Sequence, residues 1–147
     1  MGLELVPMGT QVVYPTKDAS WRFEGGPHGT RSVSNFDEIV WKSEQLNART
    51  HWAQGTYTQS AGVTEVEVRA MFETDDQALI YMQYVARVDL EIAMAGPSKI
   101  AAINAGRFET SAEQYQWLNY TQAVGSGRFD FSVPTMSYDM YVLKATA

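Results

Sequence analysis

The sequence contains no cysteine and only 2 histidines among its 147 residues. The lack of cysteine excludes disulfides, thiolate nucleophiles and zinc sites built on sulfur. His28 and His51 lie far apart and form neither a His-x-His nor a His-x-x-x-His pair, so no metal site is predicted. No cofactor is predicted either, because Gly25-Gly26 and Gly125-Ser-Gly127 do not open a helix as a nucleotide-binding fingerprint does.

Basic residues are also scarce, with 11 Lys and Arg against 17 Asp and Glu, for a net charge of -6. This balance argues against nucleic acid and against anionic membranes, since both require a basic surface. No apolar run is long enough to span a bilayer, and residues 1–8 lack the basic flank and apolar stretch of a signal peptide. The expected location is therefore the cytoplasm.

Aromatic residues are plentiful, at 12% of the chain with 4 Trp and 8 Tyr. Together with many short alternating segments and regularly spaced turn residues, they predict a single all-β domain over residues 1–147, either a sandwich or a barrel. At most one short helix is expected, near Ser111–Gln116, and the glycine-rich segment Trp21–Thr30 is expected to be a loop. Strands are expected at 3–14, 31–35, 38–42, 47–54, 63–74, 78–90, 100–104, 115–124 and 137–144.

Two of these strands, 63–74 and 78–90, form a hairpin whose tight turn is Asp75-Asp76. Successive side chains of a strand point to opposite faces. Periodicity does not decide which face of strand 63–74 lies inside. One face carries Glu65, Glu67, Arg69, Met71 and Glu73, and the other carries Thr64, Val66, Val68, Ala70 and Phe72.

An ordered set of short motifs resembles the domain-of-unknown-function family 3237. The matching pieces are Glu65-Val-Glu-Val-Arg69, Glu73-Thr-Asp-Asp-Gln-Ala-Leu-Ile-Tyr81, Arg107-Phe-Glu-Thr110, Tyr115-Gln-Trp-Leu-Asn119, Val124-Gly-Ser-Gly127 and Asp139-Met-Tyr141. The resemblance implies a single antiparallel β-barrel like that of allene oxide cyclase, of the calycin-like kind. It also implies an oligomer, but no known reaction.

Glu67, Arg69 and Tyr81 are the predicted catalytic residues. Glu67 and Arg69 share one face of a strand, and the hairpin brings Tyr81 onto the neighbouring strand. If that face points inward, Glu67 would move a proton, while Arg69 and Tyr81 would stabilise negative charge on oxygen. The alternative is a solvated ladder of surface charges.

Five further residues are predicted to bind the substrate. On the expected strand 115–124, Trp117 would form a wall and Asn119 would orient a ligand oxygen. Tyr141 would complete the pocket from the last strand. Trp41 and His51 are added to this set, and His51 could also act as a general base near neutral pH.

These residues predict a cofactor-free enzyme acting on a small, largely apolar, oxygenated molecule by isomerisation, cyclisation or elimination/hydration. A binding protein that uses the same cavity without turnover is the alternative. A third possibility is a structural oligomer whose exterior aromatic residues form the interface. The expected partners are the small molecule and further copies of the chain in a homo-oligomer.

Overall fold

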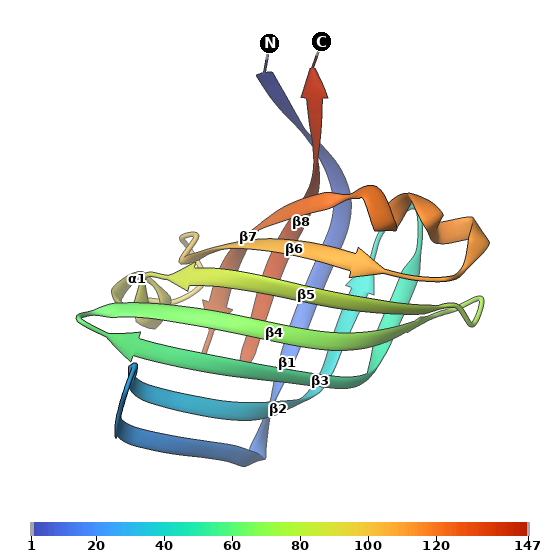
Figure 1. Cartoon of the computed structure of the whole chain (residues 1–147). Coiled ribbons are helices and arrows are strands. Elements are labelled where there is room, and N and C mark those ends of the chain that lie inside the picture. Colours follow the sequence, from blue (N-terminus) through green and yellow to red (C-terminus); the bar gives the residue numbers. More distant parts are fainter. Residues whose placement is uncertain (1, 147) are drawn as a thin grey trace.

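A computed structural model describes residues 2–146, and the side chains of all of these except 16–19. Eight strands and two short helices follow one another along the chain (Figure 1). The strands are β1 (Gly2–Gly26), β2 (Gly29–Lys42), β3 (Asn47–Ser60), β4 (Val63–Thr74), β5 (Leu79–Val88), β6 (Ala102–Glu109), β7 (Gln122–Asp130) and β8 (Thr135–Thr146). The helices are α1 (Leu90–Met94) and the 3-10 helix η1 (Glu113–Tyr120).

The strands form one closed barrel in which each strand pairs with the next and β8 pairs with β1. All eight pairings are antiparallel. The pairing with β8 covers β1 only as far as Val13, and residues 20–26 of β1 pair with β2 alone, so this part of the wall has a free edge. The first residues of β1 and the last residues of β8 run on beyond the wall, paired with each other as a projecting ribbon (Figure 1). The predicted antiparallel barrel is confirmed.

The inner face of β4 carries Thr64, Val66, Val68, Ala70, Phe72 and Thr74, all of which are buried. The side chains at the alternate positions of β4, which include Glu67 and Arg69, face outward. Apolar burial decides this orientation. Placing valine and phenylalanine inside removes their surface from water, whereas two unpaired charges inside would cost several kcal/mol each.

Large side chains fill the barrel at the end that η1 covers. Trp41 is fully buried there, stacked on Phe108 at 5.2 Å between ring centroids and edge-on to Phe72 at 5.6 Å. Its indole N–H donates a hydrogen bond of 3.0 Å to the Met8 carbonyl oxygen. Leu118 of η1 is fully buried as well. This end of the barrel is therefore solid core.

Two glycines of β7 make room for larger groups in the middle of the barrel. A Cβ atom at Gly125 would lie 2.5 Å from the Asn104 side chain, and one at Gly127 would lie 2.5 Å from the Tyr138 ring. Both neighbours are almost completely buried. Asn104 of β6 and Tyr138 of β8 are the residues paired with these glycines, so glycine leaves room for each side chain to lie over the neighbouring backbone.

Three local predictions were wrong. The segment Trp21–Gly26 is not a loop, because it extends β1 and pairs with β2 up to a turn at Pro27-His28. Most of the expected strand 115–124 is the helix η1, which overlaps the helix expected near Ser111–Gln116. A second helix, α1, was not expected. Asp89 caps its first turn by accepting a hydrogen bond of 3.1 Å from the Ile92 N–H.

Candidate functional site

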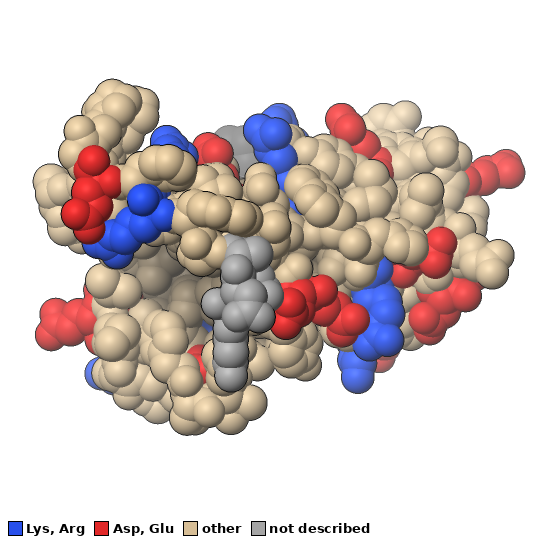
Figure 2. All heavy atoms as spheres, turned by 90° about the horizontal axis from the view of Figure 1, so that it is seen from below, with Lys and Arg blue, Asp and Glu red and all other residues tan. Residues whose placement is uncertain are grey.

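A cavity of about 360 Å³ opens at the barrel end next to α1, opposite the end that η1 covers. Its size falls in the range of small-molecule sites. Side chains from β1, β2, β3, β4, β5, β7, β8 and α1 contribute to its wall. On the face of the molecule seen in Figure 2 the surface is hollowed, and acidic and basic side chains are interspersed around it.

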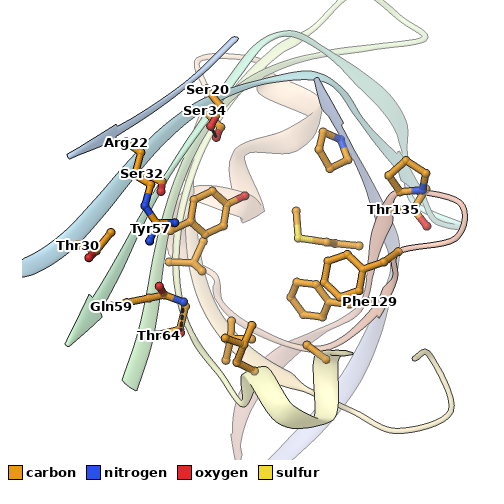
Figure 3. Close-up of a pocket in the computed structure, with 18 residues that line it drawn as sticks. Ser20, Arg22, Thr30, Ser32, Ser34, Tyr57, Gln59, Thr64, Phe129 and Thr135 are labelled. Atoms are coloured by element: carbon orange, nitrogen blue, oxygen red, sulfur yellow. Dashed lines mark hydrogen bonds between the residues drawn. The ribbon is translucent and has the colours of Figure 1, made fainter. Parts of the chain in front are cut away.

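The cavity has one polar wall and one apolar wall. Strands β1, β2 and β3 contribute the polar wall, which includes Ser20, Arg22, Ser32, Ser34, Tyr57 and Gln59. Phe129 stands across the lumen from them (Figure 3). The rest of the apolar wall comes from β5, β8, α1 and the β7–β8 turn, with Val88, Leu90, Ala93, Phe131 and Met136. A flat molecule with one polar edge matches this division.

Many polar side chains of this wall already bond to one another. The hydroxyl groups of Ser20 and Ser34 lie 3.0 Å apart. The Gln59 amide donates to the Thr64 hydroxyl at 3.4 Å. Arg22, at the mouth, pairs with Glu24 at 3.0 Å, where both side chains are well exposed. The charge of Arg22 is therefore largely compensated and screened by water.

Three tyrosines lie together where the inner end of the cavity meets the core of the barrel. Tyr57 lines it, and the rings of Tyr84 and Tyr138 form an edge-to-face pair at 5.5 Å in the adjoining core. Burial raises the pKa of Tyr57 and of Tyr84 above the usual value, with a further contribution from Tyr138. Burial also raises the pKa of Tyr138 to about 12. All three phenols therefore keep their protons at neutral pH.

The described side chains of the cavity wall can donate hydrogen bonds and bury apolar surface, but none of them would act as a base near neutral pH. Among the lining residues there is no Asp, Glu or His. Over residues 2–146 as described, no three His, Asp or Glu side chains gather closely enough to hold a metal ion. The chemistry within reach is therefore recognition of an oxygen by neutral donors and stabilisation of charge on that oxygen.

None of the eight predicted site residues lines this cavity. The prediction that Glu67, Arg69 and Tyr81 point into the barrel was wrong, since all three lie on its outer wall. Glu67 and Arg69 do lie together, in an exterior groove that also contains Arg107. Nearby, Arg87 and Glu65 form an ion pair of 2.6 Å across β4 and β5. The alternative of a surface charge ladder fits this face of the hairpin.

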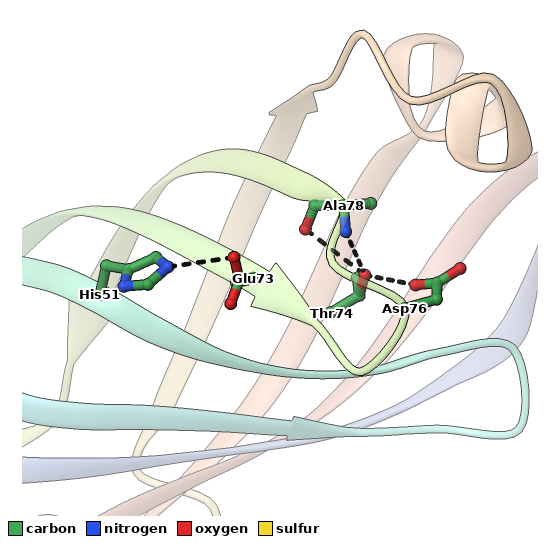
Figure 4. Close-up of polar contacts among 5 residues, drawn as sticks. All are labelled: His51, Glu73, Thr74, Asp76 and Ala78. Carbon is green, nitrogen blue, oxygen red and sulfur yellow. Dashed lines mark hydrogen bonds and ion pairs between the residues drawn. The ribbon is translucent and has the colours of Figure 1, made fainter.

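Tyr141 and His51 also face outward. Tyr141 is half-buried and opposite in parity to the inward-facing Tyr138 and Met140. His51 occupies a bulge of β3 and lies 3.5 Å from the Glu73 carboxylate, with both side chains largely exposed (Figure 4). These two residues cannot meet a ligand in the cavity.

The three other residues lie at the η1 end. Trp41 is core, as described above. The Trp117 side chain is partly buried and packs against that core. Asn119 is exposed and fixes η1 to the end of β6, since it accepts from the Thr110 N–H at 2.8 Å and donates to the Thr110 carbonyl at 2.9 Å. Because 117–119 is helical, the alternation assumed for a strand does not apply.

The sequence pattern of the residues that do line the cavity gave only a weak indication of their role. Ser32 and Ser34 alternate on β2, and Tyr57 and Gln59 alternate on β3. In a half-exposed sheet such small or polar alternation usually marks the wet face. Only closure of the barrel turns that face into a cavity wall.

The family model described as "Protein of unknown function (DUF3237)" matches residues 3–143. No match was found among curated proteins. Among solved structures, a β-barrel-like protein of Acinetobacter baumannii is 26% identical with a TM-score of 0.80, and the match covers 98% of both chains. A conserved protein of unknown function from Rhodopseudomonas palustris is 20% identical with a TM-score of 0.85, over 98% of this chain and 99% of the other.

A protein from the fungus Penicillium herquei that is described as an enzyme is similar as well. It is 18% identical with a TM-score of 0.69, and the match covers 96% of this chain and 93% of the other. At this identity the likeness shows the shared barrel. Of the helices in the described residues, none is long and apolar enough to cross a membrane.

Proposed function

We propose that this chain, which belongs to the DUF3237 family of proteins of unknown function, binds a small, flat, largely apolar oxygenated molecule in the cavity beside α1. The observation that carries the proposal is the division of the cavity into a polar and an apolar wall. A flat ring system would bury its faces against Phe129 and Met136 and present its oxygens to the wall formed by β1, β2 and β3.

Turnover of the bound molecule is the second candidate. The neutral Tyr57 phenol at the inner end favours it, because such a donor can stabilise charge that develops on a substrate oxygen. The similar barrel from Penicillium herquei is described as an enzyme. Glu67 is not available as the acid or base, since it faces outward. Because the described lining residues include no Asp, Glu or His, the proton of an isomerisation, cyclisation or elimination/hydration would move through water or through groups of the substrate itself.

Filling the cavity tests the binding proposal. Ser32→Phe places a ring inside the lumen, and the matched control Ser126→Phe adds the same ring to the outer face of β7. A naphthalene-type fluorescent ligand should bind the parent protein and the control with similar affinity, and Ser32→Phe at least tenfold more weakly. Circular dichroism should show an intact barrel in both variants. Equal affinity in all three proteins would place the binding site elsewhere.

The natural ligand can be sought directly. Protein purified under native conditions from its host should retain a small molecule that mass spectrometry identifies after extraction. The Ser32→Phe variant, purified in parallel, should lack that molecule. A retained molecule that is unchanged after prolonged incubation supports a carrier, whereas its conversion into an isomer or a dehydrated product supports an enzyme.

A further inference from the structure

We propose that the ligand carries a conjugated carbonyl group, and that the carbonyl oxygen accepts a hydrogen bond from the Tyr57 hydroxyl at the inner end of the cavity. This inference rests on the proposed binding function and adds the chemical class of the ligand and its orientation. The carbonyl end enters first, and the remainder of the ring system extends toward α1 and the mouth.

The position of the Tyr57 hydroxyl is the first argument. Tyr57 lies on β3 directly opposite Ser32 of β2. The short serine side chains remain close to the wall, whereas the tyrosine ring reaches into the lumen with its hydroxyl leading (Figure 3). Any molecule that fills the cavity to its inner end therefore meets this hydroxyl group.

The second argument is that no described side chain accepts a hydrogen bond from this hydroxyl. Within the part of the chain that the structure describes, the Tyr57 hydroxyl makes no hydrogen bond, although Ser20 with Ser34 and Gln59 with Thr64 each form a pair. Most of the Tyr57 side chain is shielded from water, which is why its pKa is raised. The hydroxyl is open to the cavity, so a ligand that displaces water from this point must supply an acceptor in its place.

The surroundings favour a carbonyl oxygen over other oxygen groups. A carboxylate would need a cation, yet the only basic side chain that lines the cavity among the described residues is Arg22, at the mouth and paired with Glu24. A neutral acceptor suits three phenols that keep their protons and can donate them in hydrogen bonds. One of them, Tyr84, has a buried hydroxyl with no hydrogen-bond partner in the described structure. A carbonyl oxygen brings two lone pairs and no proton.

Conjugation follows from the shape of the apolar wall. Phe129 and Met136 line the lumen across from the polar wall, and Val66 lies beside Tyr57 at the inner end. An aromatic ketone is flat enough to lie against Phe129 while its carbonyl reaches Tyr57. Aromatic rings gain about 0.5–1.5 kcal/mol from such contacts beyond the burial of their surface. A donated hydrogen bond would also draw charge onto the carbonyl oxygen, which is the electronic change that an enolising or cyclising reaction requires.

The test uses acetylnaphthalene and ethylnaphthalene, which are similar in shape and differ in the carbonyl group. The parent protein should bind the ketone more tightly than the hydrocarbon. Tyr57→Phe should weaken ketone binding about tenfold, the usual effect of one buried hydrogen bond, and should leave hydrocarbon binding within about twofold. Tyr81→Phe, on the outer wall, is the matched control and should change neither affinity.

Infrared difference spectroscopy with an isotope-labelled carbonyl gives a readout that is independent of affinity. The carbonyl band of the bound ketone should lie at lower wavenumber in the parent protein and in Tyr81→Phe than in Tyr57→Phe. If Tyr57→Phe changes neither the band nor the affinity while both compounds bind, the carbonyl inference is overturned and the binding function stands. If neither compound binds the parent protein, the binding function fails and the inference fails with it.

Discussion

The Tyr115 hydroxyl donates a hydrogen bond of 2.9 Å to Oδ1 of Asp76, and so joins η1 to the β4–β5 turn. The same carboxylate accepts from the Thr74 hydroxyl and, at 3.3 Å, from the Gln114 amide. Thr74 in turn accepts from the Ala78 N–H at 2.9 Å (Figure 4). One aspartate thus fixes both the turn and the helix that closes this end of the barrel.

Asp76→Asn should lower the melting temperature at neutral pH, because the charged acceptor is lost while the shape is kept. The Thr74 hydroxyl, followed by Tyr115, holds the pKa of Asp76 below its usual 3.8. A depressed pKa contributes stability above the unfolded-state value and loses it as pH falls through the folded-state value. The difference in melting temperature between the parent protein and Asp76→Asn should therefore shrink below about pH 4. Asp75→Asn is the control and should melt like the parent protein throughout.

Trp41→Phe should destabilise the barrel by about 2–3 kcal/mol in urea unfolding. The change removes buried ring volume and leaves the Met8 carbonyl without its indole donor. Trp52→Phe is the matched control, because the Trp52 side chain is 46% exposed. It should cost less than about 0.5 kcal/mol. Similar losses for both variants would contradict the assignment of Trp41 to the core rather than to a ligand site.

Gly127→Ala should cost about 1–3 kcal/mol, since the new methyl group would press on the buried Tyr138 ring. It should also weaken ligand binding, because a displaced Tyr138 ring would disturb the edge-to-face pair with Tyr84 in the core next to the cavity. Ser126→Ala, which changes the outer face of the same strand, should alter neither property. Chemical unfolding and fluorescence titration measure the two effects separately.

Glu67→Gln and Arg69→Lys should leave ligand affinity unchanged and shift the free energy of unfolding by less than about 1 kcal/mol. Both side chains lie on the outer wall. A hundredfold loss of binding or turnover in either variant would restore the hairpin exterior as the functional site. That result would also contradict a site at Tyr57.

We expect the protein to be a homo-oligomer, and the outer wall offers apolar surface for contact. Val85 and Ile103 are 54% and 58% exposed on the adjacent strands β5 and β6. Covering such residues removes apolar surface from water. Light scattering should report more than one copy at micromolar concentration, and the double variant Val85→Lys with Ile103→Lys should shift the mass toward the monomer. A monomeric parent protein at high micromolar concentration would reject this expectation.

Much of the fold could be predicted from local chemistry. Alternation over 63–74 and 78–90 indicated the hairpin, and Asp75-Asp76 indicated its turn, because both depend on side-chain patterns within a few residues. The segment Trp21–Gly26 was missed because its strand conformation depends on pairing with β2. The region around Trp117 was missed because η1 is held by Asn119, Asp76 and core contacts rather than by helical propensity.

The sequence by itself determined the all-β class, the absence of thiol chemistry and the two alternative faces of each strand. Only the tertiary structure decided which face of β4 lies inside, since both faces carry regular patterns and the choice depends on burying Val66, Val68 and Phe72 together with apolar residues from all around the barrel. It also decided where a ligand can enter. Tyr57 borders a cavity because α1 and the β7–β8 turn enclose its end of the barrel, whereas η1 and Trp41 fill the other.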